Sequence, residues 1–426
     1  MISPEITQSY ISILNEELVP AMGCTEPIAI AYASSILVDA LGERPCEILA
    51  KFSGNIIKNV KSVIVPCTGG RHGIESAIAA GIISARPDRC LQVLEELGED
   101  APGKIDEYVK LCKISIEEVN SSCTFDLHLI GRCGSDVAEV KIVGAHTNVT
   151  HVSKNGKIMT EKYSLGETFE DTFYRADRST LNVEDIVEFA DTVDLSLVSE
   201  ILEEQLAMNM AIAQEGLANT WGASIGKLLI SGENTLSRRA RAYAAAGSDA
   251  RMSGCELPVC IISGSGNQGI TASVPVKIYA DAMGVSHDTL LRALLVSDLI
   301  TIHQKNGIGC LSAYCGAVSA GVGAGAGICY LHGGRYYEIA HTLVNAVAII
   351  SGTICDGAKP SCAAKIAMAV EAGIMGMEMT RTGRQFYGGD GIVTKGVENT
   401  IRNVGRLARD GMSQTDKEII SIMLGK

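Results

Sequence analysis

The sequence predicts an α+β fold, a mainly α-helical protein with an inserted α+β domain. Runs rich in Val, Ile and Thr are confined to residues 43–192, whereas the chain from about residue 195 onward reads as helices. The segment before residue 43 is also helical and resembles the C-terminal half. We therefore expect residues 1–42 and 193–426 to form one helical domain and residues 43–192 to form the α+β domain.

Local signals place the individual elements. Ser3 is a suitable N-cap and Pro4 a suitable first residue for a helix at 4–18, and a second helix follows the segment GCTEP and ends near Gly42. Asn155-Gly156 is typical of a hairpin turn. Strands are expected at 46–52, 61–66, 114–118, 124–131 and 136–152, and helices at about 73–84, 104–112, 197–217, 238–246, 287–304, 315–330, 336–353, 363–377 and 413–424.

Composition narrows the function classes. The chain has 426 residues, of which 46% are hydrophobic and 20% charged, as in an ordinary globular protein. The net charge of −13 argues against nucleic acid or an anionic membrane as a partner. One Trp and six Phe make a base-stacking surface improbable. We expect a small-molecule partner, and a homo-oligomer is compatible with the sequence.

Two segments bear on location in the cell. The N-terminus has neither a basic region nor an apolar stretch of the signal-peptide kind, so we expect a cytoplasmic protein. Residues 308–330 carry no charge, but they are rich in Gly, Ala and Ser. A closely packed buried helix is therefore expected there, in preference to a membrane span. In a reducing cytosol the fourteen cysteines should be thiols.

Three cysteines in the last quarter of the chain are the main candidates for chemistry. Cys315 lies in LSAYCGAVSAG, and Cys355 and Cys362 lie in GTICDGAKPSC, all in surroundings of small residues. Three thiolates can hold an iron–sulfur cluster and leave one iron without a protein ligand, and such an iron is a Lewis acid. The alternative is two structural cysteines beside a turn. Cys310 competes with Cys315 for the same role.

The spacing around the last pair predicts its local structure. Gly357 and Pro360 disfavour a continuous helix, so we expect a loop from Cys355 that enters a helix with Pro360 in its first turn. Cys362 would then lie near a helix N-terminus, where the dipole favours a thiolate.

Cys24 also stands out, because it directly precedes a helix. That position, with Thr25 as a candidate cap, should lower the thiol pKa and suit a nucleophile or a general base. A plain small residue at a helix entry is the alternative.

Two Gly-rich segments are candidate anion sites. SGSGNQG follows an apolar run, and its backbone with Ser265, Asn267 and Gln268 could hold a carboxylate, or it could be a plain loop. The segment TGGRHGIES, with Arg71 and His72, is a weaker candidate of the same kind.

Three further residues, His303, Lys305 and Lys359, lie close in sequence to the cysteines. Each is a candidate for assisting proton transfer, and each is equally a surface or supporting residue.

The motifs GCTEP, SGSGNQG, LSAYCGAV and CDGAKPSCAAK, in this order, resemble those of the L-cysteine desulfidase family. This family is related to the α-chain of iron–sulfur L-serine dehydratases, and the likeness runs from near residue 10 to near residue 420. It implies a [4Fe-4S] lyase that converts L-cysteine to pyruvate, ammonia and sulfide. Carried over by position, Cys315, Cys355 and Cys362 are the cluster ligands and Cys24 is the proton acceptor. Ser265, Asn267 and Gln268 match, more loosely, the segment that receives the substrate carboxylate.

Other functions remain open from sequence alone. The same chemistry could act on L-serine, with hydroxide leaving. A non-catalytic protein with a zinc or other thiolate site would use the same cysteines. A metal-independent hydrolase would use Cys24 with a histidine such as His72. A pyridoxal enzyme is disfavoured, because the pyridine partner and phosphate site it needs are not evident.

Overall fold

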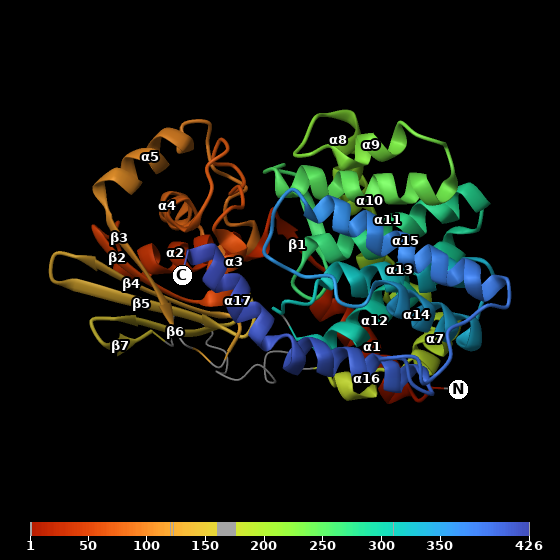
Figure 1. Ribbon diagram of the computed structural model, residues 1–426. Coiled ribbons are helices and arrows are strands. Elements are labelled where there is room, and N and C mark those ends of the chain that lie inside the picture. Colours follow the sequence, from red (N-terminus) through yellow and green to blue (C-terminus); the bar gives the residue numbers. More distant parts are fainter. Residues whose placement is uncertain (1, 120, 122, 160–175, 310, 426) are drawn as a thin grey trace.

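The chain folds into a six-stranded sheet covered by helices, beside a larger bundle of helices (Figure 1). In this computed structural model, residues 2–119, 121, 123–159, 176–309 and 311–425 are described. The strands are β1 (Val19–Met22), β2 (Glu47–Ser53), β3 (Lys113–Val119), β4 (Asp126–Cys133), β5 (Asp136–Val143), β6 (Val149–Lys154), β7 (Lys157–Ile158) and β8 (Pro258–Ile261). The helices are α1 (Pro4–Glu17), α2 (Thr25–Leu41), α3 (Gly54–Val60), α4 (Ile74–Ser84), α5 (Ala101–Leu111), α7 (Val183–Thr192), α8 (Ser199–Ala218), α9 (Ile225–Ile230), α10 (Leu236–Met252), α11 (Gly266–Met283), α12 (His287–Ile308), α13 (Gly316–Leu331), α14 (Tyr336–Ile350), α15 (Cys362–Arg381), α16 (Val397–Arg406) and α17 (Ser413–Leu424). The α+β, mainly helical class is confirmed.

The sheet has the order β3-β2-β4-β5-β6-β7. Among the described strands, β2 and β3 pair in parallel and the other neighbours pair antiparallel. Burial alternates along β4 and β5, so one face of the sheet is packed and the other is partly solvated. Helix α2 packs on β4, β5 and β6, and α4 packs on α2. Asn155 and Gly156 both have positive φ and form the predicted turn between β6 and β7. We call the region from α2 to β7, residues 25–158, the sheet unit.

The N-terminal segment divides between the two parts of the molecule. Helix α1 contacts α12, and β1 pairs with β8, so both lie with the helical bundle as expected. Helix α2, by contrast, packs on the sheet and on α4, because its apolar residues are buried on nearly every side. The domain boundaries proposed from the sequence remain a prediction.

Two of the expected strands differ. Residues 61–66 form no strand, because they lie after α3 in a turn with a single bridge from Ile64 to His72. The run 136–152 is two strands, β5 and β6, joined by a loop at 144–148. Gly144 at φ 82° begins this loop, which carries His146 toward the bundle.

Helix α13, the uncharged segment, lies at the centre of the bundle and contacts α11, α12, α14 and α15. Its glycines allow backbones to touch. A Cβ on Gly325 would lie 2.5 Å from the carbonyl oxygen of Gly373, and one on Gly321 would lie 2.4 Å from the backbone of Ala369. The expected buried helix is confirmed. No helix within the described ranges has the length and apolarity needed to cross a bilayer.

Helix α11 was not predicted. It begins within the Gly-rich segment and continues through Pro275. Nearly all of its residues are buried, so it has no polar face and hence no helical periodicity in its sequence. The consequence for the site is direct, because Asn267 and Gln268 belong to the first turn of a helix and not to a loop.

Candidate active site

Four helices begin at one cavity of about 110 Å³ between the sheet unit and the bundle. Cys24 is the N-cap of α2, Ser265 that of α11 and Cys315 that of α13, and Cys362 is the first residue of α15. Each helix N-terminus presents backbone N–H groups without intrahelical partners and a partial positive charge. The cavity is therefore suited to anionic groups.

Backbone pairing sets Cys315 beside Cys355. Tyr314 and Ile354 form an antiparallel bridge. The N–H of Cys315 donates to the carbonyl of Thr353 at 2.9 Å, and the N–H of Cys355 donates to the carbonyl of Ala313 at 2.7 Å. Two cysteines forty positions apart are thus held by a short ladder whose geometry does not depend on their side chains.

Cys362 reaches the same cavity at the end of a short loop. Its N–H donates to the carbonyl of Lys359 at 2.9 Å, and its thiol donates to the carbonyl of Gly357 at 3.8 Å. Pro360 precedes the helix by two residues, so it lies in the entering turn and not in the first helical turn that we expected. The loop itself is held by Lys365, whose Nζ donates to Ile354 O at 2.8 Å and to an Asp356 carboxylate oxygen at 2.6 Å.

The three thiols differ in their ionisation. A hydrogen bond from Cys315, together with the charges of Lys58 and Lys365, lowers the pKa of Cys355 to about 6 despite burial. The same hydrogen bond, followed by burial, raises the pKa of Cys315 well above its ordinary value. Burial raises the pKa of Cys362. The pair Cys315–Cys355 therefore shares one proton, with the negative charge on Cys355.

These thiols fit an iron–sulfur cluster by their chemistry. Among the described residues, no group of three or more His, Cys, Asp or Glu side chains is placed to hold one metal ion. In a cluster each thiolate binds a different iron, so the sulfurs need only surround a common cavity. Thiolate-only donors are the set that iron–sulfur clusters prefer. Cys310, the competing candidate, lies outside the described residues.

Cys24 lies on the same cavity, but its ionisation differs from the expectation. Its thiol donates to an oxygen of Glu26 at 3.0 Å. Burial, and then the Glu26 charge, raise the pKa of Cys24 well above its ordinary value, and the opposing charge of Arg251 is too weak to prevent this. The prediction of a lowered pKa is therefore wrong, because a helix N-terminus does not offset complete burial beside a carboxylate. Thr25 is the first helical residue and not the cap.

Glu26 is the acceptor at the centre of this region. It receives hydrogen bonds from Cys24 and, at 2.9 Å, from the side-chain amide of Asn59. Burial acts to raise the pKa of Glu26, but the charge of His146, the bond from Cys24 and the charge of Arg251 lower it on balance. Burial lowers the pKa of His146. The shared proton rests on Cys24.

Glu26, Asn59, His146 and Arg251 also line the cavity, and none of them is among the residues predicted from the sequence. Asn59 and His146 come from the sheet unit, whereas Arg251 comes from the end of α10. Glu26 could have been noticed within GCTEP. The others have no local sequence signal, because they reach the cavity only through the tertiary fold.

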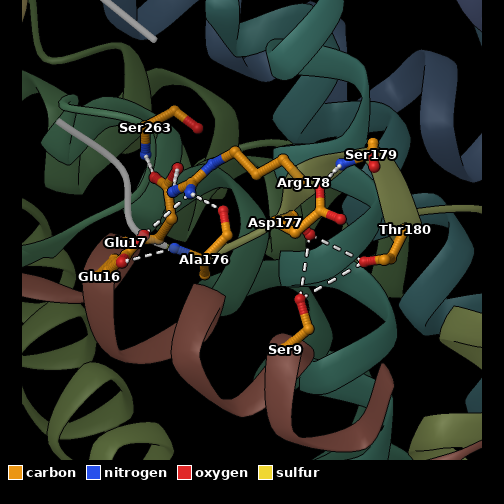
Figure 2. A network of polar contacts seen from close by, with 9 residues as sticks. All are labelled: Ser9, Glu16, Glu17, Ala176, Asp177, Arg178, Ser179, Thr180 and Ser263. Carbon is orange, nitrogen blue, oxygen red and sulfur yellow. Dashed lines mark hydrogen bonds and ion pairs between the residues drawn. The ribbon is translucent and has the colours of Figure 1, made fainter. Parts of the chain in front are cut away.

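Ser265, Asn267 and Gln268 all line the cavity, as their predicted role requires. The preceding loop is anchored from the N-terminal helix, as Figure 2 shows. The N–H of Ser263 donates to Glu17 at 2.6 Å, and the guanidinium of Arg178 donates to the other oxygen of Glu17 at 2.8 Å. Ser263 has φ 47°, a left-handed conformation that this anchor helps to hold.

The remaining candidates are mostly used elsewhere. Arg71 pairs with Asp106, and His72 is exposed, so the TGGRHG segment is not part of this cavity's lining. His303 pairs with Glu398 at 2.7 Å, and Lys359 pairs with Asp356. Lys305 does line the cavity, and its Nζ donates to the carbonyl of Gly309 at 2.7 Å.

Comparison with known proteins identifies the class. The family model described as serine dehydratase alpha chain matches residues 90–421, and the chain belongs to this family. Membership indicates a lyase, and the family is typically iron–sulfur dependent. The predicted relationship to the dehydratase α-chain is thereby confirmed.

Individual relatives match the chain over nearly its full length. A UPF0597 protein of Desulfitobacterium hafniense is 51% identical over 98% of this chain and 97% of its own. A UPF0597 protein of Lachnoclostridium phytofermentans is 46% identical over 98% and 99%, and one of Treponema denticola is 43% identical over 98% of each chain.

Proposed function

We propose that this protein is a cytoplasmic, iron–sulfur-dependent lyase that eliminates sulfide from L-cysteine and yields pyruvate, ammonia and hydrogen sulfide. The observation that carries the proposal is the convergence of Cys315, Cys355 and Cys362 on the cavity that also contains Cys24. The family match supports the reaction class, and the motifs GCTEP and CDGAKPSC favour cysteine as the substrate.

Cys315, Cys355 and Cys362 would hold a [4Fe-4S] cluster. When bound, the cluster supplies an iron without a protein ligand, a Lewis acid that would make the substrate's sulfur a better leaving group. The charges of Lys58 and Lys365 and the N-termini of α13 and α15 would stabilise the three thiolates.

Cys24 is the proposed general base. As Cys24 removes the Cα proton, the electron pair of the C–H bond forms a Cα–Cβ double bond, and the C–S bond breaks to release sulfide. The resulting aminoacrylate tautomerises to an imine, which water hydrolyses to pyruvate and ammonia. Glu26 accepts the resting proton of Cys24 in a hydrogen bond and is the group that would take it when the thiolate forms.

L-Serine is the second candidate substrate, with hydroxide as the leaving group. The description of the matching family favours it. Both substrates share the carboxylate, the ammonium and the Cα proton, so the same residues would serve either reaction.

The deciding experiment is anaerobic reconstitution with iron and sulfide, followed by kcat/KM for L-cysteine and for L-serine on one preparation. We expect a larger kcat/KM for L-cysteine, with sulfide and pyruvate formed in equal amounts. Pyruvate from L-serine alone would make the protein a serine dehydratase. A preparation with full iron and sulfide content that is inactive on both would contradict the lyase proposal for these substrates.

A further inference from the structure

Arg251 brings a buried positive charge to the cavity. It lies in the last turn of α10, is 2% exposed and lines the cavity wall. Its Nε has no hydrogen-bond partner within the part of the chain that the structure describes. A buried guanidinium is costly unless acceptors satisfy it. The Glu26 charge also acts on Arg251, but Nε still lacks an acceptor among the described residues, so a bound partner is expected.

The surroundings of Arg251 indicate what that partner is. The guanidinium lies against Gly266 in the first turn of α11, where a Cβ would be 2.4 Å from Nε and 2.9 Å from Cζ. Any larger residue at position 266 would displace the Arg251 side chain. The positive end of the α11 dipole and a planar guanidinium together suit a carboxylate, which can accept two parallel hydrogen bonds from arginine.

Unsatisfied acceptors lie next to this positive region. Oδ1 of Asn267 and Oε1 of Gln268 are buried and accept no hydrogen bond from any described residue. The Gln268 amide lies against Gly316, where a Cβ would be only 2.7 Å away, and Gly316 directly follows Cys315. Amide oxygens suit an ammonium group. The first turn of α11 contacts Arg251 through Gly266 and contacts Gly316, beside Cys315, through Gln268, so the amides lie near both regions.

We infer that Arg251 binds the α-carboxylate of the substrate, while Asn267 and Gln268, which the sequence assigned to the carboxylate, bind its α-ammonium group. The site would therefore select α-amino acids over amines or carboxylic acids that carry the same thiol. This inference deepens the proposed function and rests on it for the presence of a substrate in this cavity.

The test uses two probes that each lack one group, with anaerobically prepared, cluster-loaded protein. 3-Mercaptopropionate keeps the carboxylate and the thiol, and cysteamine keeps the ammonium and the thiol. R251M should weaken equilibrium binding of 3-mercaptopropionate by about 100-fold, because a buried charge partner is lost, and should change that of cysteamine by less than about 3-fold. N267L should show the opposite preference.

Arg241 provides the matched control, since it lies on the same helix and pairs with Glu371 at 3.1 Å. R241M should bind both probes like the wild type. Equal weakening of both probes by R251M, or no weakening of either, would overturn the inference. Failure of the wild type to bind either probe would overturn it as well.

Should R251M not fold, R251K carries the same test. A lysine keeps the charge but loses the two-pronged geometry, so binding of 3-mercaptopropionate should weaken by about 10-fold while cysteamine is unaffected. Equal losses for the two probes would again contradict the assignment.

Binding and turnover also separate the two proposals. If the wild type turned over neither L-cysteine nor L-serine while R251M selectively lost binding of 3-mercaptopropionate, that result would support the carboxylate site and contradict the lyase proposal. Active enzyme with no selective loss would leave the lyase intact and remove Arg251 from substrate recognition.

Discussion

The thiol of Cys24 donates a hydrogen bond to the carboxylate of Glu26 across 3.0 Å, and both side chains are buried at the cavity. A thiol held in this way is neutral at rest and already aligned with a proton acceptor. The arrangement allows two assignments of the base, either Cys24 with Glu26 as its partner or Glu26 alone.

Single substitutions distinguish these assignments. C24A should lower kcat by about 100- to 10,000-fold, the usual value of general-base catalysis, and leave the visible absorption of the cluster unchanged. E26Q should cost less, because the thiol stays in place. Steady-state kinetics together with iron content would measure both. If E26Q were slower than C24A, Glu26 would be the base, and full activity in C24A would remove Cys24 from the mechanism.

Loss of one predicted cluster ligand should remove cluster and activity together. We expect C355S to retain little iron after anaerobic reconstitution, because hydroxyl is a poor ligand where thiolate is required. C310S is the matched control and should keep both iron and activity. Iron and sulfide analysis on both variants measures the effect. Loss of the cluster in C310S with retention in C355S would reverse the ligand assignment.

Lys365 should control how firmly the cluster is held. It links Ile354 and Asp356 on either side of Cys355 and adds a positive charge near the thiols. K365M should therefore lose iron to a chelator faster than the wild type does, by about 10-fold for the loss of a half-buried charge contact. Lys359 is the comparison, because it also pairs with Asp356. Among the described residues it makes no hydrogen bond to Ile354, so K359M should have a smaller effect. Equal rates in both variants would contradict this role.

The Glu17 anchor should influence substrate binding from outside the cavity. E17Q weakens the contacts to Arg178 and Ser263, so the segment before α11 should lose its fixed position. We expect KM for the amino acid to rise several-fold with the iron content unchanged. E16Q is the control, because Glu16 bonds to Arg178 and to the Ala176 N–H, whereas the Ser263 N–H donates to Glu17. An unchanged KM in E17Q would show that the segment does not need this anchor.

The close contact between α13 and α15 predicts a sharp difference between two glycines. G325A would place a methyl group against the Gly373 carbonyl and should lower the free energy of unfolding by about 1–3 kcal/mol. Gly103 in α5 has no heavy atom within 4 Å of its added Cβ, so G103A should be neutral or stabilising. Urea denaturation measures both, and equal stability in the two variants would contradict the packing described.

Sequence patterns predicted the helices and strands that have a distinct periodicity or a terminal signal. Ser3 caps α1 as expected, with its Oγ accepting from the Ile6 N–H, and Gly42 ends α2 in a left-handed conformation. Helix α11 was missed because it is buried on nearly all sides. The apolar residues at 61–66 predict a strand, but they form a turn after α3 that is joined to His72 by a bridge at Ile64.

The candidate site was predictable only where chemistry was concentrated in the chain. Cysteines beside Gly, Ala and Pro are visible in a sequence, and Cys24, Cys315, Cys355 and Cys362 all line one cavity. Arg251 and His146 have ordinary neighbours in the chain. Their buried Nε and Nε2 atoms lack hydrogen-bond partners among the described residues, which is a property of three-dimensional packing. The pKa of Cys24 depends on the same packing, so a helix terminus alone gave the wrong direction.

Four helix N-termini surround the cavity, so much of the positive potential that attracts anions comes from the main chain. Peptide dipoles persist whichever side chains surround them, so a survey of point substitutions would underestimate this field. If the side chains of the pocket were changed to bind another anionic ligand, the backbone would still supply the same positive potential.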